Sequence, residues 1–312
     1  MNIGGISDLK AWKQEVEEEL AGREVVASVS GGKDSTSMAL LLIEAEIPHR
    51  FVFMDTEWEH PATKQYLLSY LQPIIGKVTV IRNQDGGMRE LVMKRKSFPS
   101  RVARFCTGEL KMQPMKNYLR SLDEEVVNAV GVRAQESARR ALYTEWEYSS
   151  QMRTDVWRPI LKWTEKEVIN MHHRHNIRPN PLYLMGTSRV GCWPCIFSSK
   201  ASLRVLATED PQRINDIRQL EFELNAHRQS LDPNAPLVSW FTRSGVYMPI
   251  DKVVDWAFTD RTGRELFTSN ERESGCMRWG LCELQHPLAA QKELIENHEP
   301  QPKIVDLKKE ED

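Results

Sequence analysis

The segment Ser30-Gly31-Gly32-Lys33-Asp34-Ser35 carries the strongest chemical signal in the sequence. Its glycines let the backbone approach an anion closely, and Lys33 adds a mobile positive charge. The segment lies between a short apolar stretch and an apolar helical pattern, so a helix N-terminus is expected to face the same anion. The types and spacing of these residues therefore predict phosphate binding, with a simple glycine turn that redirects the chain as the alternative.

Two familiar phosphate-binding motifs do not describe this loop. A Walker A loop would need a glycine where Ala27 stands and a serine or threonine where Asp34 follows Gly32-Lys33. The glycine spacing of a dinucleotide-binding fingerprint is also absent. The predicted nucleotide site is therefore of another kind, and Asp34 is a candidate for contact with Mg²⁺ or ribose.

Polar residues also follow two other predicted strands. Asp55 follows the stretch 50–54, and the cluster 131–140 follows the stretch 126–130. Because parallel sheets bind ligands at the carboxyl ends of their strands, we expect these clusters to share one site with the loop. Asp55 is a second candidate for Mg²⁺ or ribose contact, although an aspartate can also simply cap a turn.

Three arginines lie in the cluster after the 126–130 stretch: Arg133, Arg139 and Arg140. Guanidinium groups pair bidentately with phosphate and sulfate, so these residues suit substrate binding. Surface salt bridges are the alternative interpretation.

The arrangement of the elements predicts an α/β fold. Short apolar strands are expected at 25–29, 50–54, 78–81 and 126–130, with helices at 35–44 and from Pro61 to about Leu71. Alternating strands and helices indicate a doubly wound, mostly parallel sheet. Further helices are expected after a Ser7 cap, after a capping box formed by Thr164 and Glu167, and over 209–224. His172, His173 and His175 are interpreted as surface or packing residues. We expect one domain over residues 1–200 and a smaller, mainly helical region over 201–312, with a polar, frayed tail from about residue 299.

Composition limits the class of protein. The chain has 312 residues, of which 40% are hydrophobic and 28% charged, as in ordinary soluble proteins. The longest apolar runs fall short of the roughly 20 residues that cross a bilayer, and residues 1–14 show no secretory signal. A soluble, cytoplasmic protein is expected. Residues 82–120 contain ten basic and three acidic residues, a net charge of +7, which could attract a nucleotide or a nucleic acid or could be a solvated face.

The five cysteines are placed for metal or sulfur chemistry rather than for a disulfide framework. Cys192 and Cys195 are separated by two residues, a spacing that can bind one metal centre, whereas Cys106, Cys276 and Cys282 lie elsewhere. An iron–sulfur cluster needs four converging thiolates, and the same four would serve zinc. Unpaired buried thiols are the third possibility.

The whole loop resembles the PP-loop of the N-type ATP pyrophosphatases, within the adenine nucleotide alpha-hydrolase superfamily. Further segments are similar to the phosphoadenylyl-sulfate (PAPS) reductase family: Asp55-Thr56 with Pro61 and Thr63, Arg104-Phe105-Cys106-Thr107 with Lys111 and Pro114, Gly131-Val132-Arg133 with Arg139, and 159–164 continuing through 180–182. The resemblance covers roughly residues 22–200. It implies a Rossmann-like fold, ATP and Mg²⁺ as cofactors, and nucleotide contacts by the loop, Asp55, Gly131 and Arg133.

The resemblance also implies roles for the cysteines. Cys106, Cys192 and Cys195 are the first three expected ligands of an iron–sulfur cluster of the 4Fe-4S type, with Cys282 or Cys276 as the fourth. The cysteine left outside the cluster would carry or reduce sulfur. Lys33 and Asp34 complete the expected catalytic set.

Three departures separate this chain from the reductases of that family. The loop is intact where many reductases have a degraded one, Phe105-Cys106 replaces a Cys-Cys pair, and no Glu-Cys-Gly-Leu-His segment is present. An intact loop with Gly191-Cys192-Trp193-Pro194-Cys195 looks more like the sulfurtransferase of DNA phosphorothioation. The small ATP sulfurylase subunit also keeps the loop, but that resemblance leaves the cysteines unexplained.

The leading expectation is an ATP-dependent sulfurtransferase that adenylates an acceptor, which could be a nucleic acid, and receives sulfur from a donor. Its rivals are a PAPS or adenylyl-sulfate reductase that forms sulfite with a thiol reductant protein, and a non-catalytic nucleotide or nucleic-acid binding module. The sequence leaves the acceptor, the donor and the oligomeric state open.

Overall fold

The structure, a computed structural model, describes residues 6–243, 246–259 and Trp279. The strands are β1 Glu24–Ser28, β2 His49–Asp55, β3 Val78–Arg82, β4 Val126–Val130, β5 Trp146–Ser149, β6 Thr154–Trp157, β7 Phe241–Arg243 and β8 Val246–Met248. The helices are α1 Leu9–Leu20, α2 Lys33–Glu44, α3 Pro61–Gln65, α4 Gln72–Ile75, α5 Met88–Arg95, α6 Phe105–Thr107, α7 Gln113–Arg120, α8 Glu165–Arg174, α9 Pro181–Leu184, α10 Lys200–Glu209, α11 Pro211–Leu231 and α12 Ile250–Phe258. Short π-helical segments cover Tyr66–Leu71 and Gly108–Met112, and 3₁₀ turns cover Ala134–Glu136 and Arg140–Leu142. Within these described ranges, the helices are all too short or too polar to cross a lipid bilayer.

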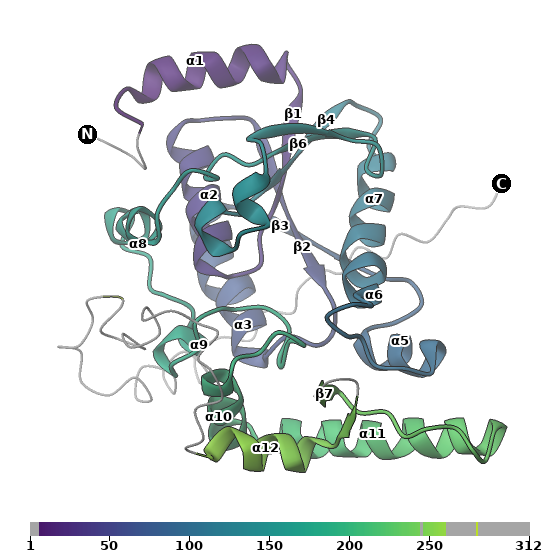
Figure 1. The fold of residues 1–312 in the computed structure, drawn as a ribbon. Coiled ribbons are helices and arrows are strands. Elements are labelled where there is room, and N and C mark those ends of the chain that lie inside the picture. The colour runs from purple at the N-terminus through teal and green to yellow at the C-terminus, as the bar shows by residue number, and fades with distance from the viewer. Residues whose placement is uncertain (1–5, 244–245, 260–278, 280–312) are drawn as a thin grey trace.

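Six strands form one sheet in the order β3-β2-β1-β4-β6-β5, and only β5 runs antiparallel to its neighbour. Along the chain, the sheet grows from β1 to β2 and β3 on one side and then resumes at β4 on the other. The loops after β1 and β4 therefore diverge at a topological switch point, where sheets of this type bind ligands. The predicted doubly wound, mostly parallel α/β fold is confirmed (Figure 1).

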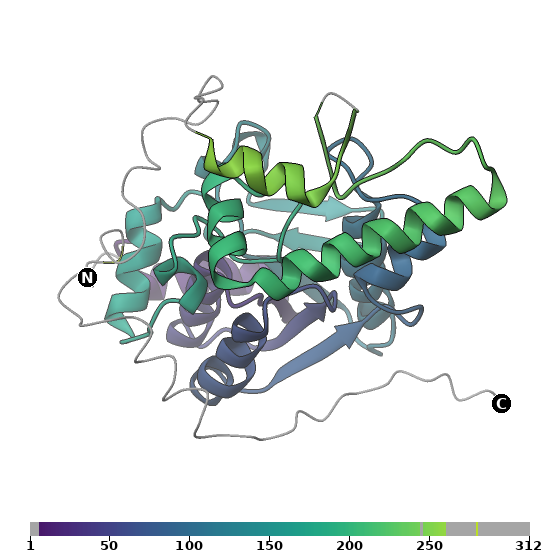
Figure 2. The same ribbon diagram turned by 90° about the horizontal axis from the view of Figure 1, so that it is seen from below.

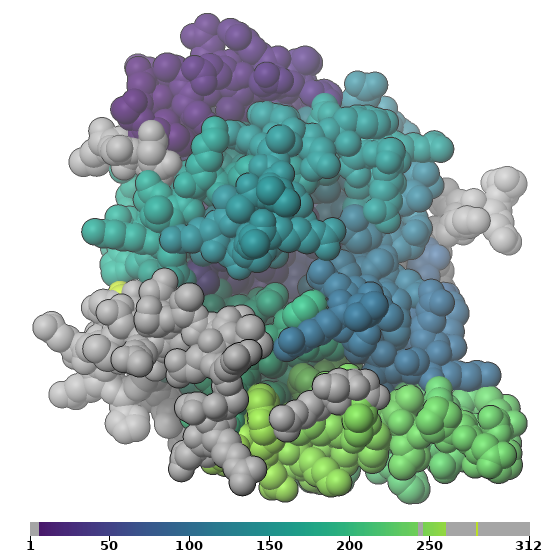
Figure 3. All heavy atoms as spheres, viewed as in Figure 1, coloured from purple at the N-terminus to yellow at the C-terminus, as the bar shows by residue number. Residues whose placement is uncertain are grey.

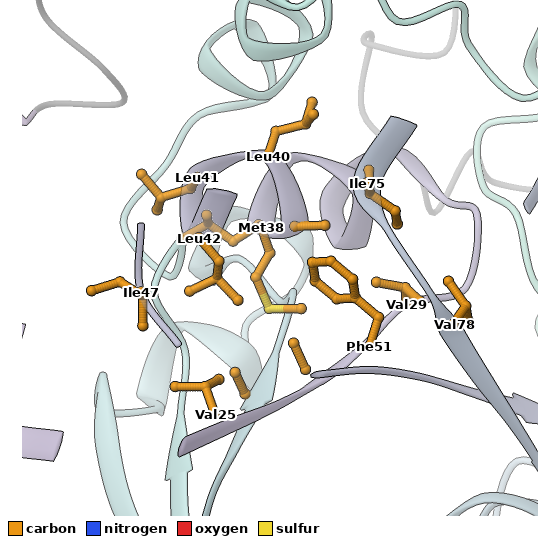
Figure 4. Packing of buried hydrophobic residues seen from close by; sticks show 14 of the residues in the cluster. Val25, Val29, Met38, Leu40, Leu41, Leu42, Ile47, Phe51, Ile75 and Val78 are labelled. Atoms are coloured by element: carbon orange, nitrogen blue, oxygen red, sulfur yellow. The ribbon is translucent and has the colours of Figure 1, made fainter. Parts of the chain in front are cut away.

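Helices cover both faces of the sheet because alternate strand residues point in opposite directions. Val25 and Phe51 face α2, where Met38 packs against them in the largest buried cluster (Figure 4). Val26, which follows Val25 in the sequence, points to the other face and packs with Met115 of α7. Strands that are buried on both faces explain why these segments read as continuous apolar runs.

The C-terminal region is mainly helical, as predicted, and α11 runs alongside α12 (Figure 2). Leu206, Leu220 and Val253 belong to one buried cluster with Trp58 and Trp193. Trp58 follows β2, and Trp193 lies between the two cysteines of the Cys-x-x-Cys segment. The C-terminal helices therefore support that segment from behind.

Several local predictions need correction. The cap of α1 is Asp8, not Ser7, because the Asp8 carboxylate accepts from the backbone N–H groups of the first helical turn. The helix predicted at 209–224 is α11, which begins at Pro211 after its Asp210 cap and continues to Leu231. Strands β5 and β6 are absent from the prediction. The capping box at α8 is confirmed, whereas the polar tail lies outside the described residues.

Glu221 joins the C-terminal elements. Its buried carboxylate accepts hydrogen bonds from the backbone N–H of Trp240 at 2.9 Å and of Ile250 at 3.0 Å. Burial raises the pKa of Glu221 to about 6, although these two bonds oppose the shift. When the pKa of a carboxyl group is higher in the folded than in the unfolded protein, the group contributes most to stability at a pH below its unfolded pKa. This contribution is lost as the pH rises through the folded pKa of about 6.

Replacing Glu221 with Ala should lower the free energy of unfolding by about 2–3 kcal/mol at pH 5, because two buried N–H groups lose their acceptor. The loss should be smaller at pH 8, where the buried carboxylate of the wild type is charged. Urea denaturation at both pH values measures it. Glu223→Ala is the control, since Glu223 bonds to the side chains of Arg89 and Gln219 at the surface and its loss should cost less than about 1 kcal/mol. Equal losses in the two variants would contradict this account.

Candidate nucleotide and sulfur site

The segment 30–35 makes a tight turn between β1 and α2. Gly31 adopts a φ of 70°, which glycine reaches without steric cost. The backbone N–H of Ser30 donates to Ser35 Oγ at 3.1 Å, and the two hydroxyl oxygens lie 3.2 Å apart. From outside the loop, the side-chain amide of Asn180 donates to the Gly31 carbonyl at 3.1 Å. These bonds fix the loop at the positive end of the α2 dipole.

Lys33 is the first residue of α2, and its side chain is only 8% exposed. Its Nζ lies 3.4 Å from Glu165 and 3.8 Å from Asp34, and donates to the Ser188 carbonyl at 3.3 Å. Burial lowers the pKa of Lys33, but the nearby Tyr183, Asp34 and Glu165 outweigh burial, so the pKa is raised overall. The site therefore holds a buried ammonium that stays charged at neutral pH.

The loop after β4 packs directly against the start of α2. A Cβ atom on Gly131 would lie 2.7 Å from Ser35 Cα and 3.0 Å from the Asp34 carbonyl oxygen, so only glycine fits there. Two residues later, the buried guanidinium of Arg133 donates to the Asp34 carboxylate. Two of the predicted clusters thus meet at the switch point.

A cavity of about 470 Å³ opens beside these groups. Its lining includes Ser30, Gly32, Lys33, Asp34, Ser35, Lys111, Gly131, Arg133, Glu136, Arg140, Glu165, Tyr183, Ser188 and Arg189. Five of these side chains are basic and three are acidic, so the lining favours an anion. In Figure 3 the surface is hollowed between the teal segment near residue 140 and the blue segment near residue 100. The volume suits a small-molecule ligand.

Three predicted contact residues, Gly31, Asp55 and Arg139, do not line this cavity. The Asp55 carboxylate pairs with Lys64 at 2.7 Å and Arg82 at 2.8 Å. Burial raises the pKa of Asp55, but the two cations and the hydrogen bond from the Glu57 N–H lower it by more. The pKa of Asp55 is therefore depressed overall. Arg139 is exposed at the surface. Arg140 does line the cavity, paired with Glu136. The structure therefore brings one of the two predicted substrate arginines to the site.

The three described cysteines lie beside the cavity. The Cys192 segment forms a β-bridge with Glu59, and Cys192 Sγ is 3.7 Å from Thr56 Oγ1. Cys106 and Cys192 pack against the same buried cluster, and both are close enough to Cys195 for their charges to interact. Burial raises the pKa of both thiols. The nearby Cys195 adds to the shift at Cys106, whereas the charge of Lys111 opposes it at Cys192. These sulfur atoms are neighbours in space despite their separation in sequence.

Lys111 links the sulfur atoms to the cavity that it lines. The charge of Cys192 raises the pKa of Lys111, and Glu59 adds to the effect against the opposing influence of burial. A cation at this position can stabilise negative charge on a thiolate or on a ligand in the cavity.

The described cysteines do not by themselves form a metal site. Among the described residues, no three His, Cys, Asp or Glu side chains are arranged to hold a metal ion. Cys276 and Cys282, the predicted fourth ligand and sulfur-carrying thiol, lie outside the described residues.

The basic segment 82–120 is not a uniform cationic surface. Four of its ten basic side chains pair with carboxylates: Arg82 with Asp55, Arg89 with Glu223, Lys94 with Asp85, and Arg95 with Glu109. Lys111 lines the cavity instead. Arg101 and Arg104 are exposed and lie over the ring of Phe197.

Sequence reasoning missed several residues that hold the loop. Tyr183 accepts a hydrogen bond from the Lys33 N–H, and Glu165 faces the Lys33 ammonium. His172, interpreted as a surface or packing residue, is buried and bonded to the Lys33 carbonyl. Glu165 is the first residue of α8 and directly follows Thr164, whose capping box was recognised in the sequence. That capping box was the sequence pattern from which the position of Glu165 could have been found. No comparable sequence pattern points to Tyr183 or His172.

Gly131→Ala should lower the free energy of unfolding by about 1–3 kcal/mol, because the new methyl group would overlap backbone atoms of α2. Thermal unfolding measures the change. Gly108→Ala is the matched control, since no atom lies within 4 Å of its built Cβ. A Gly131→Ala protein as stable as the control would show that the two loops are not in contact.

Several known proteins are similar to this chain over part of its length. A protein of Escherichia phage 186, described only as an uncharacterized 37.8 kDa protein in the gpa 5′ region, is 34% identical over 247 residues, which cover 63% of this chain and 74% of the relative. The adenosine 5′-phosphosulfate reductase of Allochromatium vinosum is 31% identical over 99 residues, 32% of this chain and 37% of that enzyme. A PAPS reductase structure from Candida auris, in complex with phosphate, has a TM-score of 0.48 at 13% identity and covers 59% of this chain and 88% of its own.

A family profile, the phosphoadenosine phosphosulfate reductase domain, matches residues 24–198. This range runs from β1 through the Cys-x-x-Cys segment and includes the loop, Arg133 and Lys111. It spans more than half of the sequence, and the chain belongs to the phosphoadenosine phosphosulfate reductase domain family.

Proposed function

We propose that this protein is an ATP-dependent sulfurtransferase that cleaves ATP between the α and β phosphates and adenylates an acceptor. The observation that carries the proposal is a buried Lys33 ammonium at the N-terminus of α2, with a raised pKa, facing a cavity with an excess of basic side chains. An intact loop of this type suits a nucleotide that still carries its β and γ phosphates. Family membership supports adenine-nucleotide chemistry at the same place.

In this proposal Lys33 and the first turn of α2 bind the β and γ phosphates. The carboxylates of Glu165 and Asp34, which now face Lys33, hold the ammonium in position until phosphate oxygens replace them. Asp34 is also the cavity carboxylate best placed to bind Mg²⁺, a cation that favours carboxylate and phosphate oxygens. Magnesium would neutralise part of the charge on the phosphates.

The chemistry proceeds in two displacements. An acceptor oxygen forms a bond to the α phosphorus, the bond to the bridging oxygen breaks, and pyrophosphate leaves. Lys33 and Arg133 stabilise the negative charge that develops. A sulfur nucleophile at the oxidation level of hydrosulfide then bonds to the acceptor and AMP leaves, so no electrons are gained or lost.

The cysteine cluster supports sulfur chemistry at this site. Cys192 and Lys111 lie next to the cavity in which the activated acceptor would bind. The resemblance to cluster-bearing relatives leads us to propose that Cys106, Cys192 and Cys195 contribute to an iron–sulfur cluster, with zinc as the alternative. Cys282 or Cys276 would supply the fourth thiolate.

The acceptor is proposed to be a polyanion such as a nucleic acid. Arg101 and Arg104 are exposed near the cysteine segment, through Phe197, and make no ion pair with other described residues. Phosphate backbones bind such arginines in a salt-dependent manner. The DNA phosphorothioation enzymes, which the intact loop and cysteines resemble, would be the corresponding class.

A second candidate is the reduction of an activated sulfate to sulfite. The similarity over 99 residues to an adenosine 5′-phosphosulfate reductase favours it. Sulfite formation from adenylyl sulfate or PAPS without ATP would select this function. Nucleotide binding without any turnover would instead select a non-catalytic binding module.

Lys33→Ala should reduce pyrophosphate release from ATP at least 100-fold, because one preorganised charge at the developing anion is removed. Release is measured with Mg²⁺ and single-stranded and double-stranded DNA as acceptors. Lys162→Ala is the matched control, since that lysine is 82% exposed and does not line the cavity. No release by the wild type, or equal release by the Lys33 variant, would contradict the proposal.

Protein purified without oxygen should be brown and should contain iron and acid-labile sulfide. Cys192→Ser should lose both, because one ligand is removed. Comparing Cys276→Ser with Cys282→Ser identifies the fourth ligand as the cysteine whose loss abolishes iron binding. Zinc alone would indicate a structural site, and protein without metal would refute the cluster.

A further inference from the structure

The backbone of Lys33 is held on two sides by ring residues from later elements. Tyr183 of α9 accepts a hydrogen bond from the Lys33 N–H at 3.0 Å. His172 of α8 lies with Nε2 3.0 Å from the Lys33 carbonyl oxygen, to which it donates. Both residues are less than 5% exposed. These two rings therefore fix the peptide groups on either side of the Lys33 side chain.

The tautomer of His172 follows from this geometry. Because the Lys33 carbonyl can only accept, Nε2 carries the proton, and Nδ1 has no partner among the described residues. Burial lowers the pKa of His172 to about 4. The imidazole is neutral at physiological pH and is held by one hydrogen bond and by packing.

Trp279 covers both rings. Its indole is 2% exposed, with its ring centroid 5.0 Å from that of His172 in an edge-on arrangement and 5.6 Å from that of Tyr183. In the sequence it lies well beyond residues 24–198, the part that matches the family. A residue from the C-terminal part of the chain thus completes the packing beneath the phosphate loop.

We propose that Trp279 is a positioning residue for the phosphate loop, acting through His172 and Tyr183 on the backbone of Lys33. The inference rests on the proposed nucleotide binding. It adds that tight binding of the nucleotide requires Trp279, a residue outside the family domain. Edge-on and tilted contacts between aromatic rings favour particular ring orientations beyond the effect of the area that they bury. With Trp279 removed, both rings can rotate and the loop samples orientations that do not bind phosphate.

The affinity for ATP tests this proposal. Trp279→Ala should weaken ATP binding about tenfold, the effect expected when two aromatic pairs are lost. AMP binding should change less than threefold, because AMP lacks the phosphates that the loop holds. Trp279→Phe, which keeps a flat ring, should restore most of the affinity, and Trp279→Leu, which keeps only apolar volume, should not. Isothermal titration calorimetry measures all of these constants.

The control is Trp256→Ala, which removes a tryptophan that is 38% exposed and lies near Lys200 on the C-terminal helices. It should bind ATP as the wild type does. Thermal unfolding of every variant separates folding from binding. Should Trp279→Ala fail to fold, the contrast between the Phe and Leu variants decides.

The possible failures are distinguishable. A wild-type protein that binds no ATP would contradict the proposed function itself. A wild type that binds ATP, with Trp279→Ala and Trp279→Leu binding equally well, would overturn only the role of Trp279. Equal weakening of ATP and AMP would show that Trp279 has a general structural role.

Discussion

A buried ammonium at the start of a helix is the constraint from which the site follows. Lys33 is charged although it is almost fully covered, and such a charge is costly unless negative groups surround it. Glu165, Asp34 and the Ser188 carbonyl fill that role in the structure. Each of these groups comes from a different part of the chain or from the loop itself. Burying Lys33 therefore requires the loop, α8 and the segment after α9 to meet.

The sheet provides that meeting point. Its order places β1 beside β4, so the phosphate loop and the Gly131–Arg133 turn lie together at the switch point. The cysteine segment approaches from the β2 side through its bridge to Glu59 and is supported by the C-terminal helices. Lys111 lies between the two groups. The loop after β1 lines the cavity, and Lys111, which also lines it, interacts with the cysteine segment.

Local patterns in the sequence predicted much of this arrangement. The four parallel strands β1 to β4, α2 and the capping box of Thr164 follow from periodicity and cap residues that act over a few positions. The meeting of the loop with Arg133 follows from the rule for strand ends. The pairing of Asp55 with Lys64 and Arg82 was not predictable, since it depends on which cations the tertiary fold brings near. The same holds for Tyr183, His172 and Trp279, which act through contacts between distant segments.

The central claim is that Lys33 and the start of α2 hold the β and γ phosphates of ATP. A crystal structure with Mg²⁺ and a non-hydrolysable ATP analogue tests it most directly. The account predicts that these phosphates lie against the backbone of residues 31–35 and within hydrogen-bond distance of Lys33 Nζ, with the α phosphate turned toward Arg133 and Lys111. A nucleotide bound elsewhere, or one whose phosphates point away from Lys33, would contradict it.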